Sequence, residues 1–565
     1  MRTFLSTRSL AITIMVIATI LAITSVWNDS LIVDEDPHIG AGYSYLVMQD
    51  MRLNPEHPPL AKDLAALPLL FLDLDQTAFQ SKAWQTDING QWEFGRKLIY
   101  NSGNNADLIT HAAKIPMLIF FIGSAIIIFI WSRKLWGDRA ALLALTLFSF
   151  SPTIMAHARF VTTDMAALFG VLSATYFFTT YLQQPTRRNF WLASVFFGIA
   201  LICKFSTILL VPLFIVLALI WNYRFLLKTA LVIITGFVII VWPVYFFHTR
   251  GYPPERQHRD TAQLLSVHNH QMLARGVVWA SDKPVLRAAA QYGLGLMMVQ
   301  QRSTGGNTVY FKGTITNSAG SWYFPFVYFV KEPLAWWGLV IIALCALILK
   351  LKSQNFKLQV LRFKIKDHLP EVAMLLWLAM YWAVSITSTL NIGVRHLLPV
   401  YPFIIMLVAG QVSQFAYRVA RYALYILLAW YVLANLSVYP FYLTYFNQTV
   451  GGASGGHEYV VDSNLDWGQD LKRFANWTKD NNIKKIELDY FGWADQYYYL
   501  GDRFLWLNAD KYKSEADFKA RNTSDGWIAV SATYLMNESK TKYAWLYAHK
   551  PITVIGNSIF VYRIL

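Results

Sequence analysis

The chain has 565 residues, of which 55% are hydrophobic and only 15% are charged, and its mean hydropathy is +0.34. These values exclude an ordinary soluble globular protein, in which about 25% of the residues are charged. The formal net charge of +15 does not indicate a nucleic-acid partner either, because a nucleic-acid reader carries its positive charge on a soluble face or arm.

Eleven apolar runs are about as long as the path across a hydrocarbon core, which is roughly 30 Å thick. They lie at 10–27, 115–132, 139–156, 164–182, 190–203, 206–221, 226–247, 334–350, 371–389, 397–416 and 421–442. The shorter run 64–72 predicts a segment that lies along the membrane surface. The chain is therefore expected to be an α-helical polytopic membrane protein with about eleven transmembrane helices.

Lysine and arginine in the loops predict the orientation of these helices. With a cytoplasmic N-terminus, every inner loop is basic, including the run from Lys350 to Lys366, whereas the short outer loops hold only Arg159, Lys204 and Arg395. The first apolar run lacks a signal-peptidase pattern and is expected to be an anchor. The net charge then reflects topology and attraction to anionic lipid headgroups.

Three segments on the predicted outer side are long, and they set the expected domains. Segments 28–114 and 248–333 interrupt the transmembrane domain, 1–442, and are expected to carry helices lying at the interface. The third, 443–565, alternates helical pieces with strand-like runs and predicts a small extracytoplasmic α/β domain. Its strand-like runs are 486–490, 527–530 and 551–555.

An acidic cluster follows the first apolar run directly. Asp34, Glu35 and Asp36 are adjacent, so mutual repulsion and partial burial would raise the pKa of at least one of them and favour a proton acceptor near neutral pH. A general base, a metal site and a solvated helix cap all remain open on these residues alone. Twenty residues later, prolines fix a turn around His57, which either orients a substrate, binds a metal or is merely structural.

Further charged residues lie at the outer ends of predicted helices. Asp164 opens one helix, where it either caps the N-terminus, favoured by the helix dipole, or faces a site. Lys204 either extends its amine to the interface or binds a lipid phosphate. Arg395, followed by His396, has a guanidinium that can bind phosphate oxygens with two hydrogen bonds.

Five segments occur in an order that is typical of one enzyme family. They are Asp34 to Leu46 with Asn54 to Leu60, Cys203 to Ser206, Trp322 to Phe326 with Lys331 to Pro333, Asn391 to Pro402, and Asp462 to Leu471. Together they resemble the bacterial phospholipid-carrier-dependent glycosyltransferases, relatives of the protein O-mannosyltransferases and of the aminoarabinose transferase acting on lipid A. The resemblance covers residues from about 5 to 475.

The resemblance implies a GT-C fold, in which a helical bundle and long outer loops enclose a cavity open to lipid and water. It implies an inverting transfer of one sugar from a polyprenyl-phosphate to a hydroxyl of an acceptor protein, lipid or glycan, at the outer face of the bacterial cytoplasmic (inner) membrane. The aspartate of the family's Asp-Glu pair falls on Asp34, the expected base. Glu35 is expected to be the second catalytic carboxylate.

The donor phosphate is expected to meet fixed cations, because negative charge accumulates on it as the sugar departs. The expected phosphate-binding residues are Lys204, Arg395, His396 and Lys331, and the expected substrate-orienting residues are His57, Asp164, Asp462 and Asp466. No cofactor and no metal is expected, since the leaving group is already a phosphate monoester. A transporter or flippase of lipid-linked sugars is the alternative, but it would need ionisable groups at mid-membrane. A catalytically silent scaffold or sensor is the third possibility.

Overall fold

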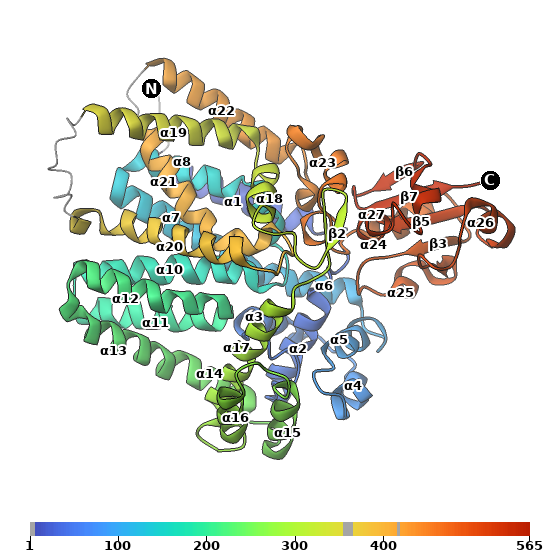
Figure 1. Ribbon diagram of the computed structural model, residues 1–565, viewed down its shortest axis with the longest axis horizontal. Coiled ribbons are helices and arrows are strands. Elements are labelled where there is room, and N and C mark those ends of the chain that lie inside the picture. The colour runs from blue at the N-terminus through green and yellow to red at the C-terminus, as the bar shows by residue number, and fades with distance from the viewer. Residues whose placement is uncertain (1–5, 354–364, 415–417) are drawn as a thin grey trace.

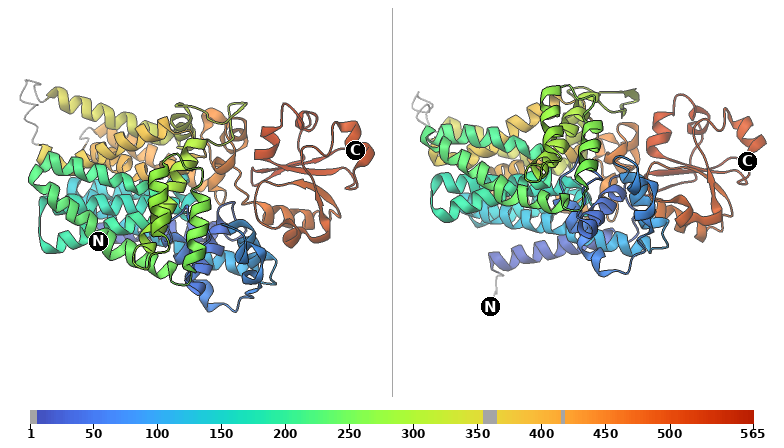
Figure 2. Two further views of the ribbon diagram at one scale, coloured as in Figure 1. Left: turned by 60° about the horizontal axis from the view of Figure 1, so that its bottom comes forward. Right: turned by 90° about the horizontal axis from the view of Figure 1, so that it is seen from below.

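The computed structural model describes residues 6–353, 365–414 and 418–565. Most of the basic loop from Lys350 to Lys366 and the end of the predicted run 397–416 lie outside the described residues. Long helices run side by side as a bundle, and a β-sheet lies beyond one end of it (Figure 1). The loop helices lie at the same end of the bundle as the sheet (Figures 1 and 2).

Six of the described helical segments are long and apolar enough to cross a membrane, or eight if each of two bent pairs is one span. The chain is therefore a multi-pass membrane protein. The bundle consists of α1 (Thr7–Ser25), α7 (Leu118–Trp136), α8 (Asp138–Ser149), α9 (Pro152–Ala158), α10 (Thr163–Gln183), α11 (Arg187–Cys203), α12 (Leu210–Trp221), α13 (Leu226–Gly236), α14 (Trp242–Thr249), α19 (Leu334–Ser353), α20 (Leu369–Thr387), α21 (Tyr401–Ser413) and α22 (Arg418–Leu436).

A helix lies at each of the eleven predicted runs, but the count of eleven spans is not confirmed. Proline breaks the run 139–156 and bends the chain just before the run 334–350, because it lacks a backbone N–H and cannot continue a helix. Pro152 opens α9, which is bent by 62° from α8, and Pro333 separates α19 from α18 (Tyr323–Lys331) at a bend of 107°. The apolar helices Phe205–Trp221 and Tyr422–Leu436 are shorter than a full span.

The first long loop folds into short helices between α1 and α7. They are α2 (Glu35–Met48), α3 (Leu60–Ala66), α4 (Lys82–Gln85), α5 (Gln91–Tyr100) and α6 (Ala106–Lys114). The run 64–72 forms the end of α3 and a 3-10 turn, and it is not among the spans. Glycines let α2 and α5 touch, since a Cβ added to Gly40 would lie 2.7 Å from Gly95 Cα.

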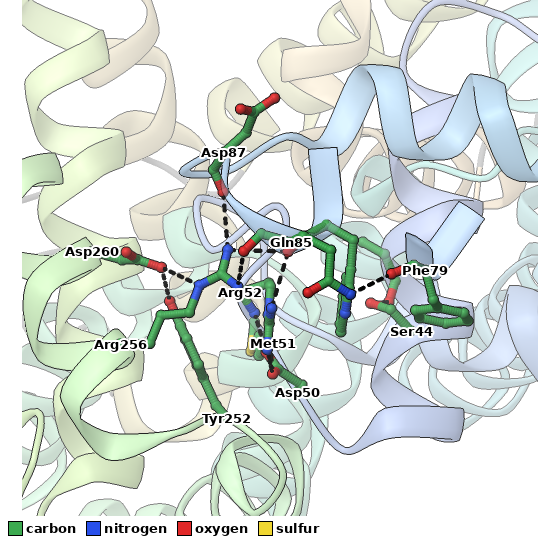
Figure 3. A network of polar contacts seen from close by, with 12 residues as sticks. Ser44, Asp50, Met51, Arg52, Phe79, Gln85, Asp87, Tyr252, Arg256 and Asp260 are labelled. Atoms are coloured by element: carbon green, nitrogen blue, oxygen red, sulfur yellow. Dashed lines mark hydrogen bonds and ion pairs between the residues drawn. The ribbon is translucent and has the colours of Figure 1, made fainter. Parts of the chain in front are cut away.

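The second long loop packs on the first. It contains α15 (Pro254–Leu264), α16 (Gln271–Ala280), α17 (Arg287–Gly305), a hairpin of β1 (Val309–Phe311) and β2 (Thr314–Thr316), and α18. Arg256 of α15 donates to the carbonyl oxygens of Gln85, at 2.8 Å, and of Trp84, at 3.0 Å (Figure 3). Because charged donors on backbone carbonyls make strong hydrogen bonds, this network fixes the two loops to each other.

The C-terminal segment forms a five-stranded sheet in the order β4-β3-β5-β7-β6. Its parallel part is β3 (Ile486–Asp489) between β4 (Phe504–Trp506) and β5 (Trp527–Ser531). The antiparallel part adds β7 (Ile559–Arg563) and β6 (Thr553–Ile555). Strands β3, β5 and β6 lie at the three predicted runs, whereas the division of the chain into two domains stays a prediction. Helices pack around the sheet: α24 (Leu471–Asp480), α25 (Gln496–Leu500), α26 (Glu515–Arg521), α27 (Ala532–Asn537) and α28 (Ala544–Tyr547).

Candidate active site

A cavity of about 760 Å³ opens at the end of the bundle that carries the loops and the sheet. This volume lies within the usual range of small-molecule sites, about 300–1,000 Å³. Both long loops, the bundle helices and the C-terminal segment contribute to its wall. The acidic, basic and histidine side chains that line it are Asp34, His38, Glu56, His57, Asp164, Lys204, Arg302, Arg395 and His396.

Asp34 lies at the entrance to α2, immediately after the segment that leaves α1. Its side chain is 22% exposed, whereas the residues that follow it in α2 are buried. Its Oδ2 accepts a hydrogen bond from Arg395 Nη1 at 2.5 Å. The carboxylate therefore faces the cavity and already has a cation beside it.

Arg395 and Asp34 belong to a row of alternating charges. Arg395 Nη1 is also 3.5 Å from Asp164 Oδ2, and Asp164 Oδ1 accepts from Lys204 Nζ at 2.5 Å. The Arg395 guanidinium carbon lies over the Trp467 ring, 4.1 Å from the ring centroid. We call Asp34, Arg395, Asp164 and Lys204 the charge row. Its two ends, Asp34 and Lys204, are more exposed than the two groups between them.

Residues of the charge row lie where helices begin or end. Asp164 is in the first turn of α10, and Lys204 adopts an extended conformation directly after α11. Arg395 is in a 3-10 turn that leads into α21. The predicted convergence of Asp34 and Arg395 is confirmed by this geometry, while the chemical roles of the row remain predictions.

Three histidines line the cavity beside the row. His38 Nδ1 donates to the Val161 carbonyl oxygen at 2.8 Å, and the His38 and His57 rings meet edge to face at 5.1 Å. Burial lowers the pKa of both, and that of His57 falls well below its usual value. Near neutral pH these two rings are therefore neutral hydrogen-bonding groups. His396 lines the cavity next to Arg395.

Glu35 does not reach the cavity. It is fully buried, and its carboxylate accepts from the backbone N–H groups of Ile32, at 2.9 Å, and Val161, at 2.8 Å. It also forms an ion pair with Lys114 Nζ at 3.1 Å. This position does not suit a second catalytic carboxylate, because the contacts of Glu35 are with the protein interior.

Lys331 is also sealed in the interior. Its Nζ donates to the carbonyl oxygens of Leu443 and Asn464, both at 2.7 Å, and it packs over the Phe446 ring at 4.2 Å. It does not line the cavity. Lys331 therefore links α18 to the segment that follows α22. Its amine is not placed to bind a phosphate in the cavity.

Asp462 and Asp466 lie behind the cavity wall and do not line it. Burial raises the pKa of Asp462 to about 6, against the opposing effect of the Arg395 charge, and Asp462 Oδ1 accepts from the Ser463 N–H at 2.5 Å. Burial raises the pKa of Asp466 to about 8, and its Oδ2 accepts from the Thr533 N–H at 2.8 Å. Both carboxyl groups therefore accept hydrogen bonds within the C-terminal segment, and substrate orientation by them stays a prediction.

Two tryptophans in the wall were not anticipated. Trp92 of α5 stacks on Trp493, which follows β3, with ring centroids 5.0 Å apart and planes inclined by 27°. Beside the stack, Arg96 Nη2 forms an ion pair with Asp495 Oδ2 at 2.9 Å. No sequence signal identifies such a pair, because its partners meet only through tertiary packing.

Polar residues near the tryptophans were missed as well. Glu56 accepts from Gln91 Nε2 at 2.6 Å and from Asn89 Nδ2 at 3.2 Å, and Glu56 and Gln91 both line the cavity. Arg302, near the end of α17, adds an exposed cation to the lining. Arg302 is one of six arginines in the outer segment 248–333, and nothing in the sequence distinguishes it from the others.

No group of three or more His, Cys, Asp or Glu side chains is arranged to hold a metal ion within 6–353, 365–414 and 418–565. The expectation that no metal and no cofactor takes part therefore stays a prediction.

Residues 109–247 match a family model described as dolichyl-phosphate-mannose-protein mannosyltransferase. The matched stretch runs from α6 to α14 and includes Asp164 and Lys204 of the charge row. Over these residues the resemblance to the mannosyltransferase group is confirmed. No curated protein is significantly similar to the chain in sequence.

Three solved structures give weak matches to the fold. ArnT from Cupriavidus metallidurans bound to undecaprenyl phosphate has a TM-score of 0.48 and 12% identity over 97% of each chain. AglB from Archaeoglobus fulgidus, with an inhibitory peptide and a dolichol-phosphate, has a TM-score of 0.43 and 12% identity over 95% of this chain and 72% of AglB. The Pmt1-Pmt2 complex of S. cerevisiae bound to its sugar donor has a TM-score of 0.31 and 17% identity over 45% and 34%. Because all three TM-scores are below 0.5, we base no assignment on them.

Proposed function

We propose that the protein is an inverting glycosyltransferase that moves one sugar from a polyprenyl-phosphate donor to an acceptor hydroxyl at the outer face of the bacterial inner membrane. The observation that carries the proposal is the charge row, in which two carboxylates and two cations face one cavity at the end of an apolar helical bundle. The mannosyltransferase family model over residues 109–247 supports the same class of reaction.

The donor phosphate would bind at the cationic side of the row. Lys204 and Arg395 border the cavity, and Arg302 lies in the same lining. A phosphate that binds the Arg395 guanidinium competes with the Asp34 carboxylate, because both anions accept hydrogen bonds from the same N–H groups. Donor binding then frees Asp34, while buried Asp164 keeps Lys204 and Arg395 in place.

Asp34 would act on the acceptor hydroxyl. A positioned carboxylate that accepts the hydroxyl proton contributes about 10²–10⁴ in rate. The sugar would leave with oxocarbenium character, and attack from the face opposite the phosphate inverts its configuration. Arg395 and Lys204 would stabilise the charge that develops on the leaving phosphate, an effect that is largest where water is excluded.

The cavity has an apolar side and a polar side that suit the two substrates. Leu209, Leu296 and Val299 line it on the side of α12 and α17, where the isoprenoid chain of a donor would leave the phosphate. Glu56, with the stacked Trp92 and Trp493, lines the side toward the C-terminal segment. We propose that the acceptor, a protein or a glycolipid, enters past these aromatic rings.

The outer location rests on the basic inner loops together with the position of the cavity. The charge row lies at helix ends and not at mid-membrane, which disfavours the transporter alternative. Membrane lipids are the remaining expected partners, and no nucleic acid is expected.

Comparing the masses of surface glycans and glycoproteins from cells with and without the protein would identify the acceptor and the sugar. With these in hand, Asp34→Asn should lower turnover in membranes by about 10² or more with donor binding retained. Asp73→Asn, an exposed aspartate of the same loop, is the matched control and should leave turnover unchanged. Near-normal transfer by Asp34→Asn would reject Asp34 as the base.

A further inference from the structure

A second concave surface lies at the opposite end of α1 from the cavity. It is a groove of about 520 Å³ between the first half of α1 and the second half of α7. It shares no lining residue with the cavity. Helix α1 has 19 residues and, at a rise of 1.5 Å per residue, is roughly 28 Å long. The groove lies along its first half and Asp34 follows its end, so much of this length separates them.

The walls of the groove are apolar side chains at helical spacing. Ile12 and Met15 come from α1, and Ile126 and Ile130 come from α7. Ile12, Ile126 and Ile130 are 56%, 41% and 48% exposed. α1 lies at the edge of the bundle (Figure 2, right), and only 17% of its apolar window is buried. The groove therefore opens toward the lipid and not into the protein.

Three cations surround one end of this groove. Arg133 is paired with Asp138, with Nε 2.5 Å from Oδ1. Within the part of the chain that the structure describes, Arg8 and Lys134 have no carboxylate partner. Three cations and one carboxylate leave an excess of positive charge next to an apolar groove. This arrangement fits an amphiphile with an anionic headgroup.

We propose that this groove is a binding site for one anionic glycerophospholipid. Its phosphate lies between Arg8 and Lys134, and one acyl chain lies along Ile12, Met15 and Ile126. Each cation near an anionic headgroup contributes about a factor of five in affinity, so the pair selects an anionic lipid over a zwitterionic one. The lipid fills the space between α1 and α7 and steadies the helix that leads into Asp34.

Native mass spectrometry of the purified full-length protein, titrated with phosphatidylglycerol or phosphatidylcholine, tests the proposal. The double variant Arg8→Ala/Lys134→Ala should bind phosphatidylglycerol about 30-fold more weakly than wild type, with little change toward phosphatidylcholine. Arg187→Ala/Arg188→Ala is the matched control, because it removes two exposed arginines from the first turn of α11 and so changes the net charge by the same amount. Met15→Trp narrows the apolar groove at constant charge and should also weaken the binding of phosphatidylglycerol.

Equal binding of the two lipids by wild type, or equal losses in the two double variants, would overturn the site in favour of diffuse surface charge. Displacement of phosphatidylglycerol by millimolar inorganic phosphate, with Met15→Trp unaffected, would assign the cations to a free anion instead. If Arg8→Ala/Lys134→Ala does not fold, the wild-type preference and Met15→Trp still decide the question, since neither removes a charge.

Discussion

Asp34 and Glu35 are neighbours in the sequence and have opposite surroundings in the structure. Asp34 faces the cavity and shares Arg395 with Asp164, whereas Glu35 has no exposed surface and is paired with Lys114. One step along an α-helix turns a side chain by about 100°, and here that step takes Glu35 away from the cavity and into the protein interior. The comparison separates charges that face the cavity from charges that stabilise the surrounding fold.

Asp36 extends the comparison by a further step. Its carboxyl group is fully buried, and neither of its oxygens has a hydrogen-bond partner among the residues that the structure describes. Burial raises its pKa well above the usual value, and the charge of Glu35 adds to the rise. Arg96 and Lys114 oppose the rise, but burial disfavours the charged form of the carboxyl group more strongly. The acidic cluster therefore comprises one carboxylate at the cavity, one buried ion pair and one buried carboxyl group with a raised pKa.

Glu35→Gln should produce the largest effect on stability. It leaves Lys114 as an uncompensated buried charge, which typically costs about 3–5 kcal/mol in the free energy of unfolding. Thermal unfolding of the purified protein measures the loss. Asp34→Asn, in contrast, should leave the unfolding temperature within a few degrees of wild type. If Glu35→Gln were stable but inactive, Glu35 would belong to the substrate site after all.

Arg395→Ala should have the next largest effect, on donor use. Loss of one fixed charge-stabilising donor costs about 10²–10³ in rate, and the variant also leaves Asp34 without its cation. Arg395→Lys should recover part of the activity, because lysine keeps the charge and loses the fork geometry. Turnover against donor concentration measures both. Unchanged donor kinetics in Arg395→Ala would place the phosphate elsewhere in the cavity.

The sequence predicts which charges gather, but not which of them stay accessible. Asp34, Asp164, Lys204 and Arg395 all lie at helix ends on one predicted side, so their meeting follows from topology. Lys331 has the same sequence features and is nevertheless enclosed. Its burial depends on how the segment after α22 folds back over α18, and no local pattern carries that information.

The fold shows the same division. Apolar runs predict where the helices are, because hydrocarbon thickness sets their length. The bends at Pro152 and Pro333 decide how many of them span, and the size of a bend depends on the helices packed around it. The stack of Trp92 on Trp493 depends on how the C-terminal segment meets α5, which is a property of the assembled molecule.

Asp466 gives the smallest and most gradual effect, a dependence of stability on pH. Burial and the neighbouring Asp470 and Asp462 raise its pKa from 3.8 to about 8. Between about pH 4 and pH 8 the folded protein therefore holds one proton that the unfolded chain has released. Stability falls as the pH rises through this window, by at most about 1.4 kcal/mol per pH unit.

Asp466→Asn should remove this decline, because asparagine is neutral at every pH and its oxygen can still accept from the Thr533 N–H. Wild type and variant should unfold at similar temperatures near pH 5, and the variant should be the more stable one near pH 8. Thermal unfolding at the two pH values checks the difference. Parallel pH profiles would show that Asp466 is already ionised in the folded protein. Its charge would then need a nearby cation, such as Lys114 provides for Glu35.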